Sequence, residues 1–175
     1  MSVDDSKKAL VLFSGGLDST TTLAYALSKN YKVIALTINY QQRHSYEIEA
    51  SKKIISKHSN VQHIIFDIDL AKIGGSALTD QDIEVPVKSS EGIPVTYVPA
   101  RNTIFLSIAA SFAEKYFIRD IFIGVNAVDY SGYPDCRPEF INAYEKMINM
   151  GTRAGSEGHA FKIHTPLINL SLIHI

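Results

Sequence analysis

The chain has 175 residues, of which 46% are hydrophobic and 20% charged, a composition typical of one globular domain. Its formal net charge of -1 argues against general electrostatic binding to nucleic acid or to an anionic membrane. The single cysteine, Cys136, excludes an intrachain disulfide and favours a cytoplasmic location. The first apolar run, at 9–13, is too short for a signal peptide or a membrane span.

Short apolar runs alternate along the chain with stretches of helical periodicity. We expect strands at 9–13, 33–40, 61–70, 121–125 and 161–165, and helices at 20–30, 45–58, 102–116 and 138–150, the last capped by Gly151. This alternation predicts an α/β fold, a Rossmann-like sandwich of about five parallel strands with helices on both faces. Ligands of such sheets bind at the carboxyl ends of the strands. Residues 71–94 lack periodicity, which is typical either of a functional connection or of a plain surface excursion.

A small glycine-rich turn, SGGLDS at 14–19, joins the first expected strand to the first expected helix. No lysine follows its glycines as in a Walker loop, and the dinucleotide G-x-G-x-x-G and hydrolase G-x-S-x-G patterns are absent. Gly15 and Gly16 let backbone N–H groups approach a phosphate, and the helix presents its positive end. Ser14, Ser19 and Thr20 add hydroxyl donors, so the turn predicts a phosphate site.

Asp18 stands where other nucleotide loops carry a lysine. Its carboxylate can be interpreted in two ways. It caps the following helix, or it is a ligand of a Mg²⁺ ion, and that ion in turn binds phosphate oxygens.

The turn and its strand–turn–helix setting resemble the pyrophosphate loop of the PP-loop ATP pyrophosphatases, which share the adenine nucleotide alpha hydrolase type of fold. That resemblance implies ATP and Mg²⁺ as cofactors, with adenylation of a carboxyl or carbonyl oxygen and release of pyrophosphate. It also implies a nucleotide site along the loop and the first turns of the helix, comprising Phe13, Ser14, Gly15, Gly16, Leu17, Asp18, Ser19, Thr20, Thr21, Thr22 and Leu23.

Three further stretches, NYQQRH at 39–44, VPARN at 98–102 and GVNAVDYSGYPDCRPEF at 124–140, fall where a parallel sheet places its site. Together with the loop they resemble the 7-cyano-7-deazaguanine synthase family from about residue 9 to residue 171. The resemblance implies conversion of 7-carboxy-7-deazaguanine, ammonia and ATP into the nitrile base of queuosine biosynthesis. Because the nitrile also loses the amide oxygen, we expect the same site to activate that oxygen a second time. No glutaminase half is evident, so free ammonia is the expected nitrogen source.

Arg101 opens an expected helix, where the helix dipole disfavours a cation unless an anion is bound nearby. It is therefore expected to contact phosphate or the substrate carboxylate, and with Asp18 it is our candidate for catalysis. Asn102 caps the same helix or contacts the ligand. Gln42 and Arg43 supply donors and acceptors from the loop after the second strand.

The block at 126–137 holds polar side chains between turn residues. Asp129 or Asp135 is expected to accept the adjacent N–H groups of a guanine-like base, and Tyr130 or Tyr133 to stack on its ring. Asn126 and Arg137 complete the predicted substrate residues, whereas Cys136 is expected to be structural.

The expected partners are small molecules, with no membrane and no nucleic acid, and a homo-oligomer is left open. We expect residues 1–175 to form a single domain that lacks the family's C-terminal zinc-binding segment, because only one cysteine is present. Zinc is expected in the family but not in this chain, whose stability and activity are expected to be low in consequence. The rival readings are a related enzyme acting on a tRNA base and an inactive nucleotide-binding form.

Overall fold

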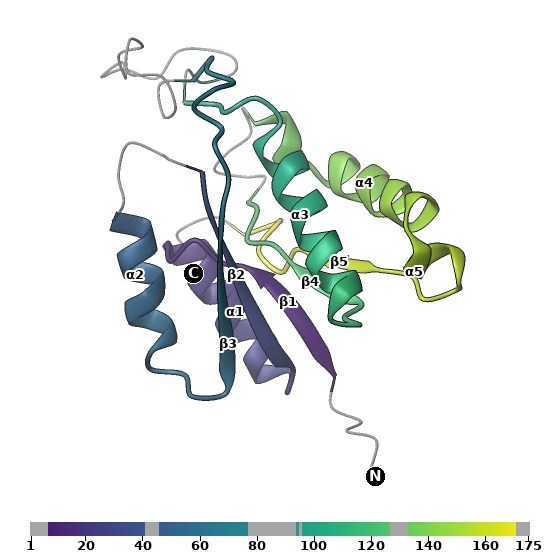
Figure 1. The fold of residues 1–175 in the computed structure, drawn as a ribbon, viewed down its shortest axis with the longest axis horizontal. Coiled ribbons are helices and arrows are strands. Elements are labelled where there is room, and N and C mark those ends of the chain that lie inside the picture. Colours follow the sequence, from purple (N-terminus) through teal and green to yellow (C-terminus); the bar gives the residue numbers. More distant parts are fainter. Residues whose placement is uncertain (1–6, 41–45, 77–93, 95, 127–132, 171–175) are drawn as a thin grey trace.

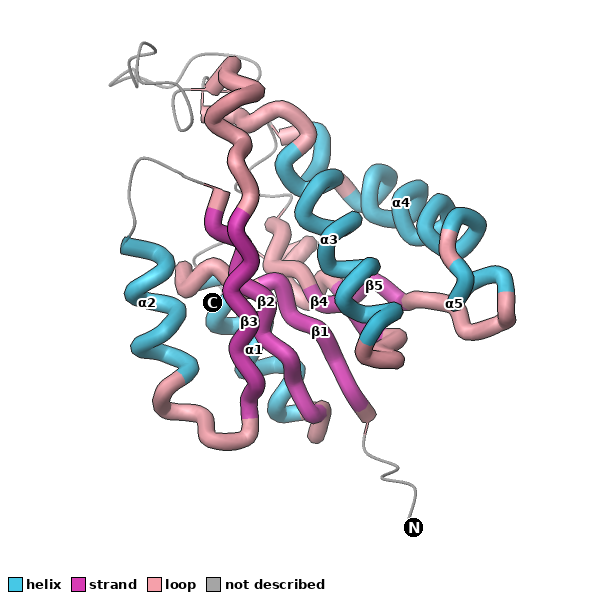
Figure 2. Tube along the Cα trace, viewed as in Figure 1, coloured by secondary structure: helices cyan, strands magenta, loops and turns pink. Residues whose placement is uncertain are grey.

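The computed structural model describes residues 7–40, 46–76, 94, 96–126 and 133–170. The described strands form one parallel sheet, as predicted, in the order β3-β2-β1-β4-β5 (Figures 1 and 2). They span Lys8–Leu12 (β1), Lys32–Asn39 (β2), Val61–Asp67 (β3), Asp120–Phe122 (β4) and Lys162–His164 (β5). β1 is central, and the order reverses beside it, so its carboxyl end lies at the point where such sheets place a ligand.

Helices cover both faces of the sheet, as expected (Figure 1). They span Leu17–Ser28 (α1), Tyr46–Ile55 (α2), Arg101–Lys115 (α3), Pro138–Gly151 (α4) and Arg153–Ser156 (α5), with a 3-10 turn η1 at Pro134–Cys136. Successive side chains of β1 point to opposite faces. Leu10 and Leu12 therefore pack with α3 and α4, whereas Val11 packs with α1 and α2.

Several predicted boundaries are wrong. Helix α1 begins at Leu17 instead of residue 20, because Gly16 takes the N-cap position in an extended conformation. Gly151 does not cap α4, because it still belongs to the helix and Thr152 follows as the C-cap. The Thr152 hydroxyl then accepts the N–H of Gly155 and starts α5, a short helix that the sequence did not suggest.

Three strands, β3, β4 and β5, are shorter than expected, and β5 spans Lys162–His164 instead of 161–165. β4 ends at Phe122 instead of residue 125, although the N–H of Ile123 still donates to the carbonyl of His164 at 3.0 Å, and Gly124 beyond it lies against the start of α1. β3 ends at Asp67 instead of residue 70. Most of the segment predicted without periodicity, 71–94, lies outside the described residues. Among the described helices, none is long and apolar enough to cross a membrane.

Candidate functional site

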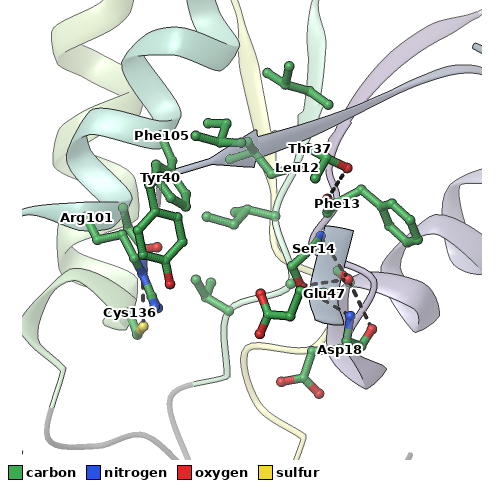
Figure 3. A pocket seen from close by; sticks show the side chains of 18 of the residues that line it. Leu12, Phe13, Ser14, Asp18, Thr37, Tyr40, Glu47, Arg101, Phe105 and Cys136 are labelled. Atoms are coloured by element: carbon green, nitrogen blue, oxygen red, sulfur yellow. Dashed lines mark hydrogen bonds between the residues drawn. The ribbon is translucent and has the colours of Figure 1, made fainter. Parts of the chain in front are cut away.

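A cavity of about 470 Å³ opens at the carboxyl ends of β1, β2 and β4 (Figure 3), within the size range of small-molecule sites. Its floor is apolar and comes from the strand ends and α3, whereas polar side chains gather at two opposite ends. The lining residues are Leu12, Phe13, Ser14, Gly16, Leu17, Asp18, Ser19, Leu36, Thr37, Ile38, Tyr40, Glu47, Ile48, Arg101, Asn102, Phe105, Ile123, Gly124, Val125, Asn126, Tyr133 and Cys136.

At one end of the cavity, the loop between β1 and α1 folds around the hydroxyl group of Ser19. That oxygen accepts the N–H groups of Ser14 and Gly15 at 3.3 and 3.2 Å and donates to the carbonyl of Gly16 at 3.0 Å. The N–H of Gly16 points to the Ser14 hydroxyl at 3.3 Å. Two of these N–H groups thus point to the Ser19 hydroxyl and the third to the Ser14 hydroxyl, all beside the positive end of α1, where a helix favours an anion.

Two glycines hold this loop by close backbone packing. Gly15 has φ of +87°, and a Cβ there would lie 2.7 Å from the backbone nitrogen of Ser51 in α2. A Cβ at Gly124 would lie 3.0 Å from the carbonyl carbon and oxygen of Asp18. Any side chain at either position would therefore push the loop away from α2 or from the end of β4.

Asp18 lies in the first turn of α1 and lines the cavity. It is not the N-cap, because Gly16 occupies that position and no side chain bonds there. The capping interpretation of Asp18 is therefore wrong. Glu47, in the first turn of α2, brings a second carboxylate to the same end of the cavity (Figure 3).

These two carboxylates fit Mg²⁺, which takes one or two protein carboxylates, phosphate oxygens and water. The same residues do not fit zinc. Among the described parts of the chain, no group of three or more His, Cys, Asp or Glu side chains could hold a metal ion.

Arg101 occupies the other end of the cavity, at the start of α3 (Figure 3). Beside it lies Tyr40, which is 6% exposed and packs its ring 5.4 Å from that of Phe105. Burial raises the pKa of the Tyr40 hydroxyl, and the nearby guanidinium of Arg101 opposes part of that rise. At neutral pH the pair therefore presents a neutral phenol next to a fixed positive charge.

The first turn of α3 is tied to η1 by Asn102 and Asp135. The N–H of Asn102 donates to Oδ2 of Asp135 at 3.0 Å, and its Nδ2 donates to the Asp135 carbonyl and to Sγ of Cys136. Asn102 is not the cap of α3, because Ala100 takes that position with φ of 54°. Asp135 lies outside the main cavity, in a smaller recess behind Arg101.

Cys136 lines the cavity but is 5% exposed. Burial, with Asp135 adding to it, raises the pKa of its thiol to about 11. The group is therefore a protonated thiol at neutral pH, which agrees with the structural role expected of it.

The structure divides the predicted site residues into three groups. Those on the cavity wall are Phe13, Ser14, Gly16, Leu17, Asp18, Ser19, Arg101, Asn102, Asn126 and Tyr133. Those described but away from the wall are Gly15, Thr20, Thr21, Thr22, Leu23, Asp135 and Arg137. Gln42, Arg43, Asp129 and Tyr130 lie outside the described residues.

The residues away from the wall have other contacts. The Thr20 and Thr21 hydroxyls donate to the backbone carbonyls of Gly16 and Leu17 within α1. Thr22 and Leu23 are buried in the core, because the second turn of α1 faces the sheet. Arg137 is the N-cap residue of α4 and is exposed.

Several wall residues were missed by sequence reasoning, chiefly Thr37, Tyr40, Glu47, Phe105 and Gly124. Tyr40 belongs to the stretch NYQQRH, and Gly124 is the first residue of the polar block after β4. Both could therefore have been predicted as site residues from these motifs. Glu47 reads as one of several charges on an amphipathic helix, and only the packing of α2 against the loop shows its place.

Comparison with known proteins adds independent findings. A family model described as Queuosine biosynthesis protein QueC matches residues 8–175. The 7-cyano-7-deazaguanine synthase of Stutzerimonas stutzeri is 54% identical over 171 residues, a match that covers 98% of this chain and 76% of the relative. That of Cellvibrio japonicus is 55% identical over 169 residues and is matched over 75% of its length, with 97% of this chain covered.

Two solved structures share the fold. A predicted subunit of tRNA methyltransferase from Methanocaldococcus jannaschii aligns with a TM-score of 0.59 at 18% identity, covering 95% of this chain and 71% of that one. A 4-thiouridine synthetase, solved as an RNA complex with bound ATP, aligns with a TM-score of 0.50 at 20% identity, covering 96% and 49%. At such identities these likenesses show the fold alone.

Proposed function

We propose a mechanism from one premise: this chain belongs to the QueC family of queuosine biosynthesis proteins. The reaction is the one for which the curated relatives are named, synthesis of 7-cyano-7-deazaguanine, and the enzyme is of the ligase type and uses ATP. The substrates that we assign are 7-carboxy-7-deazaguanine, ammonia and ATP. The observation that carries the assignment is that the anion-binding loop and Arg101 face one cavity from opposite ends.

The loop end of the cavity is our site for the phosphates of ATP. The N–H groups of Ser14, Gly15 and Gly16 donate to the hydroxyls of Ser19 and Ser14 in this structure, and a phosphate oxygen is a stronger acceptor than a hydroxyl. With the positive end of α1 behind them, they would stabilise the charge that develops on the departing pyrophosphate.

Asp18 and Glu47 are our candidates for holding Mg²⁺ at that end. The ion, when bound, neutralises phosphate charge and so allows two acidic side chains to lie beside a polyphosphate. The carboxylates themselves would fix the position of the ion relative to the loop.

Arg101 is our candidate for the carboxylate of the deazaguanine acid. A carboxylate is a poor electrophile, and its oxygen leaves poorly unless it is first joined to the α-phosphate. A guanidinium beside the neutral Tyr40 hydroxyl can hold the acid and orient its oxygen toward the loop. Ammonia then gives the amide, and a second activation of the amide oxygen leads to the nitrile.

The apolar floor between the two ends suits a flat heterocycle. We propose that Asp129 pairs with its guanine-like edge and that Tyr130 or Tyr133 stacks on it, with Asn126, Gln42 and Arg43 around it. Arg137 is exposed at the start of α4, away from the cavity wall, and is left out of this set. Tyr133 lines the cavity, and its hydroxyl pairs with Oγ1 of Thr96 at 2.7 Å. We further propose one domain, a cytoplasmic setting and small-molecule partners without nucleic acid.

The test is incubation of the purified chain with 7-carboxy-7-deazaguanine, ammonium and Mg·ATP, followed by mass analysis of the base. The expected result is a nitrile product, with pyrophosphate released. Arg101→Met should raise the KM for the acid at least about tenfold, because the charged partner of the carboxylate is lost. Arg119→Met, which removes a cation packed over Phe161, is the matched control. Pyrophosphate release with a tRNA in place of the acid would instead support an enzyme acting on a tRNA base.

A further inference from the structure

A chain of hydrogen bonds crosses three neighbouring strands and ends at the start of the anion-binding loop. The hydroxyl of Thr37 on β2 lies 2.6 Å from the carbonyl oxygen of Phe13, and Nε2 of His63 on β3 lies 2.8 Å from the same hydroxyl. Figure 3 shows the bond from Thr37 to Phe13. Phe13 directly follows β1 and directly precedes Ser14.

The direction of each bond follows from the atoms involved. The carbonyl of Phe13 can only accept, so the single proton of the Thr37 hydroxyl is donated to it. The hydroxyl then has only lone pairs to offer His63, so Nε2 must carry the proton. The imidazole is therefore fixed in its Nε2–H tautomer, and the chain runs from His63 through Thr37 to Phe13.

The surroundings favour this chain of hydrogen bonds. Thr37 is 2% exposed and Phe13 is 2% exposed, so water does not replace a lost partner easily. The His63 ring also meets the Phe13 ring edge-on, with centroids 6.4 Å apart. Burial lowers the pKa of His63, which favours the neutral ring.

We infer that Thr37 and His63 are positioning residues for the nucleotide loop, acting through the Phe13 carbonyl. The peptide that carries this carbonyl also carries the N–H of Ser14, the first of the three loop donors. Holding the carbonyl therefore sets the plane of that peptide and the direction in which the Ser14 N–H points. His63 does not line the cavity, so its effect on a ligand must pass through its neighbours there, the Thr37 hydroxyl and the Phe13 ring; His63→Phe keeps the ring contact and removes only the bond to Thr37.

This inference rests on the proposed function, because ATP is the probe. Thr37→Val keeps the shape of the side chain but leaves the Phe13 carbonyl buried without its donor, and His63→Phe keeps a ring but removes the outer donor. Each should raise the Kd for Mg·ATP about tenfold, while the KM for the deazaguanine acid changes little. Thr37→Ser restores the hydroxyl and His63→Gln restores an N–H donor, so both should bind ATP within about threefold of the unaltered protein.

Thr152→Val is the matched structural control. Its hydroxyl also makes two hydrogen bonds, to Ile148 and from Gly155, but it lies at the start of α5, away from the cavity. It should lower the Tm without changing the Kd for ATP.

The ¹⁵N chemical shifts of the His63 ring report its tautomer, and they test the chain of hydrogen bonds independently of ATP binding. An Nδ1–H tautomer would overturn the hydrogen-bond chain. Weaker binding in Thr37→Val with unchanged binding in His63→Phe would also overturn it, because Thr37 would then act by touching the nucleotide. Failure of the unaltered protein to bind ATP would overturn the proposed function, and the ring shifts would still decide the chain of hydrogen bonds.

Discussion

The carboxylate of Asp135 accepts the backbone N–H of Asn102 at 3.0 Å, so an acidic side chain from η1 closes the N-terminal turn of α3. Arg101 begins that helix, where the dipole alone would disfavour its positive charge. Asp135 thus places a negative charge at the same helix end, where it is favoured by the dipole and offsets the unfavourable charge of Arg101. Its Oδ2 is already engaged with the protein, and our proposal therefore assigns the base to Asp129.

Asp135→Asn should therefore reduce stability more than substrate affinity. The amide is a weaker acceptor and carries no charge, so the free energy of unfolding should fall by about 1 kcal/mol. Urea unfolding measures this, with Glu139→Gln, which neutralises an exposed acid in the first turn of α4, as the control. Unchanged unfolding together with weaker binding of the deazaguanine acid would show that Asp135 reads the substrate.

Gly15→Ala should disable the nucleotide loop. The left-handed φ alone costs about 1–3 kcal/mol for a residue with a Cβ, and the new atom would also meet the backbone of Ser51 at 2.7 Å. We expect loss of Mg·ATP binding in a titration calorimeter. Gly158→Ala has nearly the same φ, +79°, but open space around the added carbon, so it should keep ATP binding and lose only stability. Equal ATP affinity in both variants would mean that α2 does not constrain the loop.

Asp18→Asn should raise the Mg²⁺ concentration required for ATP-dependent activity, because a neutral amide is a poor ligand for this ion. Activity at saturating ATP and limiting Mg²⁺ should fall at least about tenfold, with the Tm nearly unchanged. Glu47→Gln should act in the same direction. Glu49→Gln, which changes an exposed acid paired with Lys52 on α2, should not. A normal Mg²⁺ requirement in the Asp18 variant would remove that residue from the metal site.

Cys136 should react slowly with iodoacetamide at neutral pH. Its folded-state pKa of about 11 means that the reactive thiolate is scarce until strongly alkaline pH. The unfolded chain loses this proton near pH 8.5, so folding stability should fall between about pH 8.5 and pH 11. Alkylation rates in buffer and in urea across this range provide the measurement. Rapid modification of the folded protein at pH 7, or loss of activity in Cys136→Ser, would indicate a chemical role for the thiol.

Local patterns in the sequence suffice for most of the fold. The apolar runs at 9–13 and 33–40 correspond to β1 and β2. They could be predicted because both strands are largely buried and consist mostly of apolar residues. The predicted start of α1 was wrong, because a serine such as Ser19 can be interpreted either as the cap of the helix or as a residue within it. Only the hydrogen bonds to the N–H groups of Ser14 and Gly15 decide between them.

The site was predicted less completely, for a physical reason. Residues within one motif, such as Ser14 and Asp18, can be placed from local chemistry. Glu47 and Thr37 reach the cavity only because α2 packs on the loop and β2 lies next to β1, and such contacts between distant segments leave no local pattern. The contact of Asp135 with α3 was missed for the same reason.

The pairing of β1 with β4 has a consequence for synthesis on the ribosome. On one edge of β1, Ala9 pairs with Val33 of β2, and on the other edge it pairs with Asp120 of β4. The first edge can therefore pair early in synthesis, whereas the second can pair only after residue 120 has been made. While residues 40–119 are being made, a nascent chain that has already folded β1 onto β2 carries an open, apolar strand edge next to its finished loop. Such an edge is a template for pairing with other chains. Slow translation between α2 and β4 should therefore promote aggregation more than the same delay after β5 has emerged, when β4 also has its partner strand.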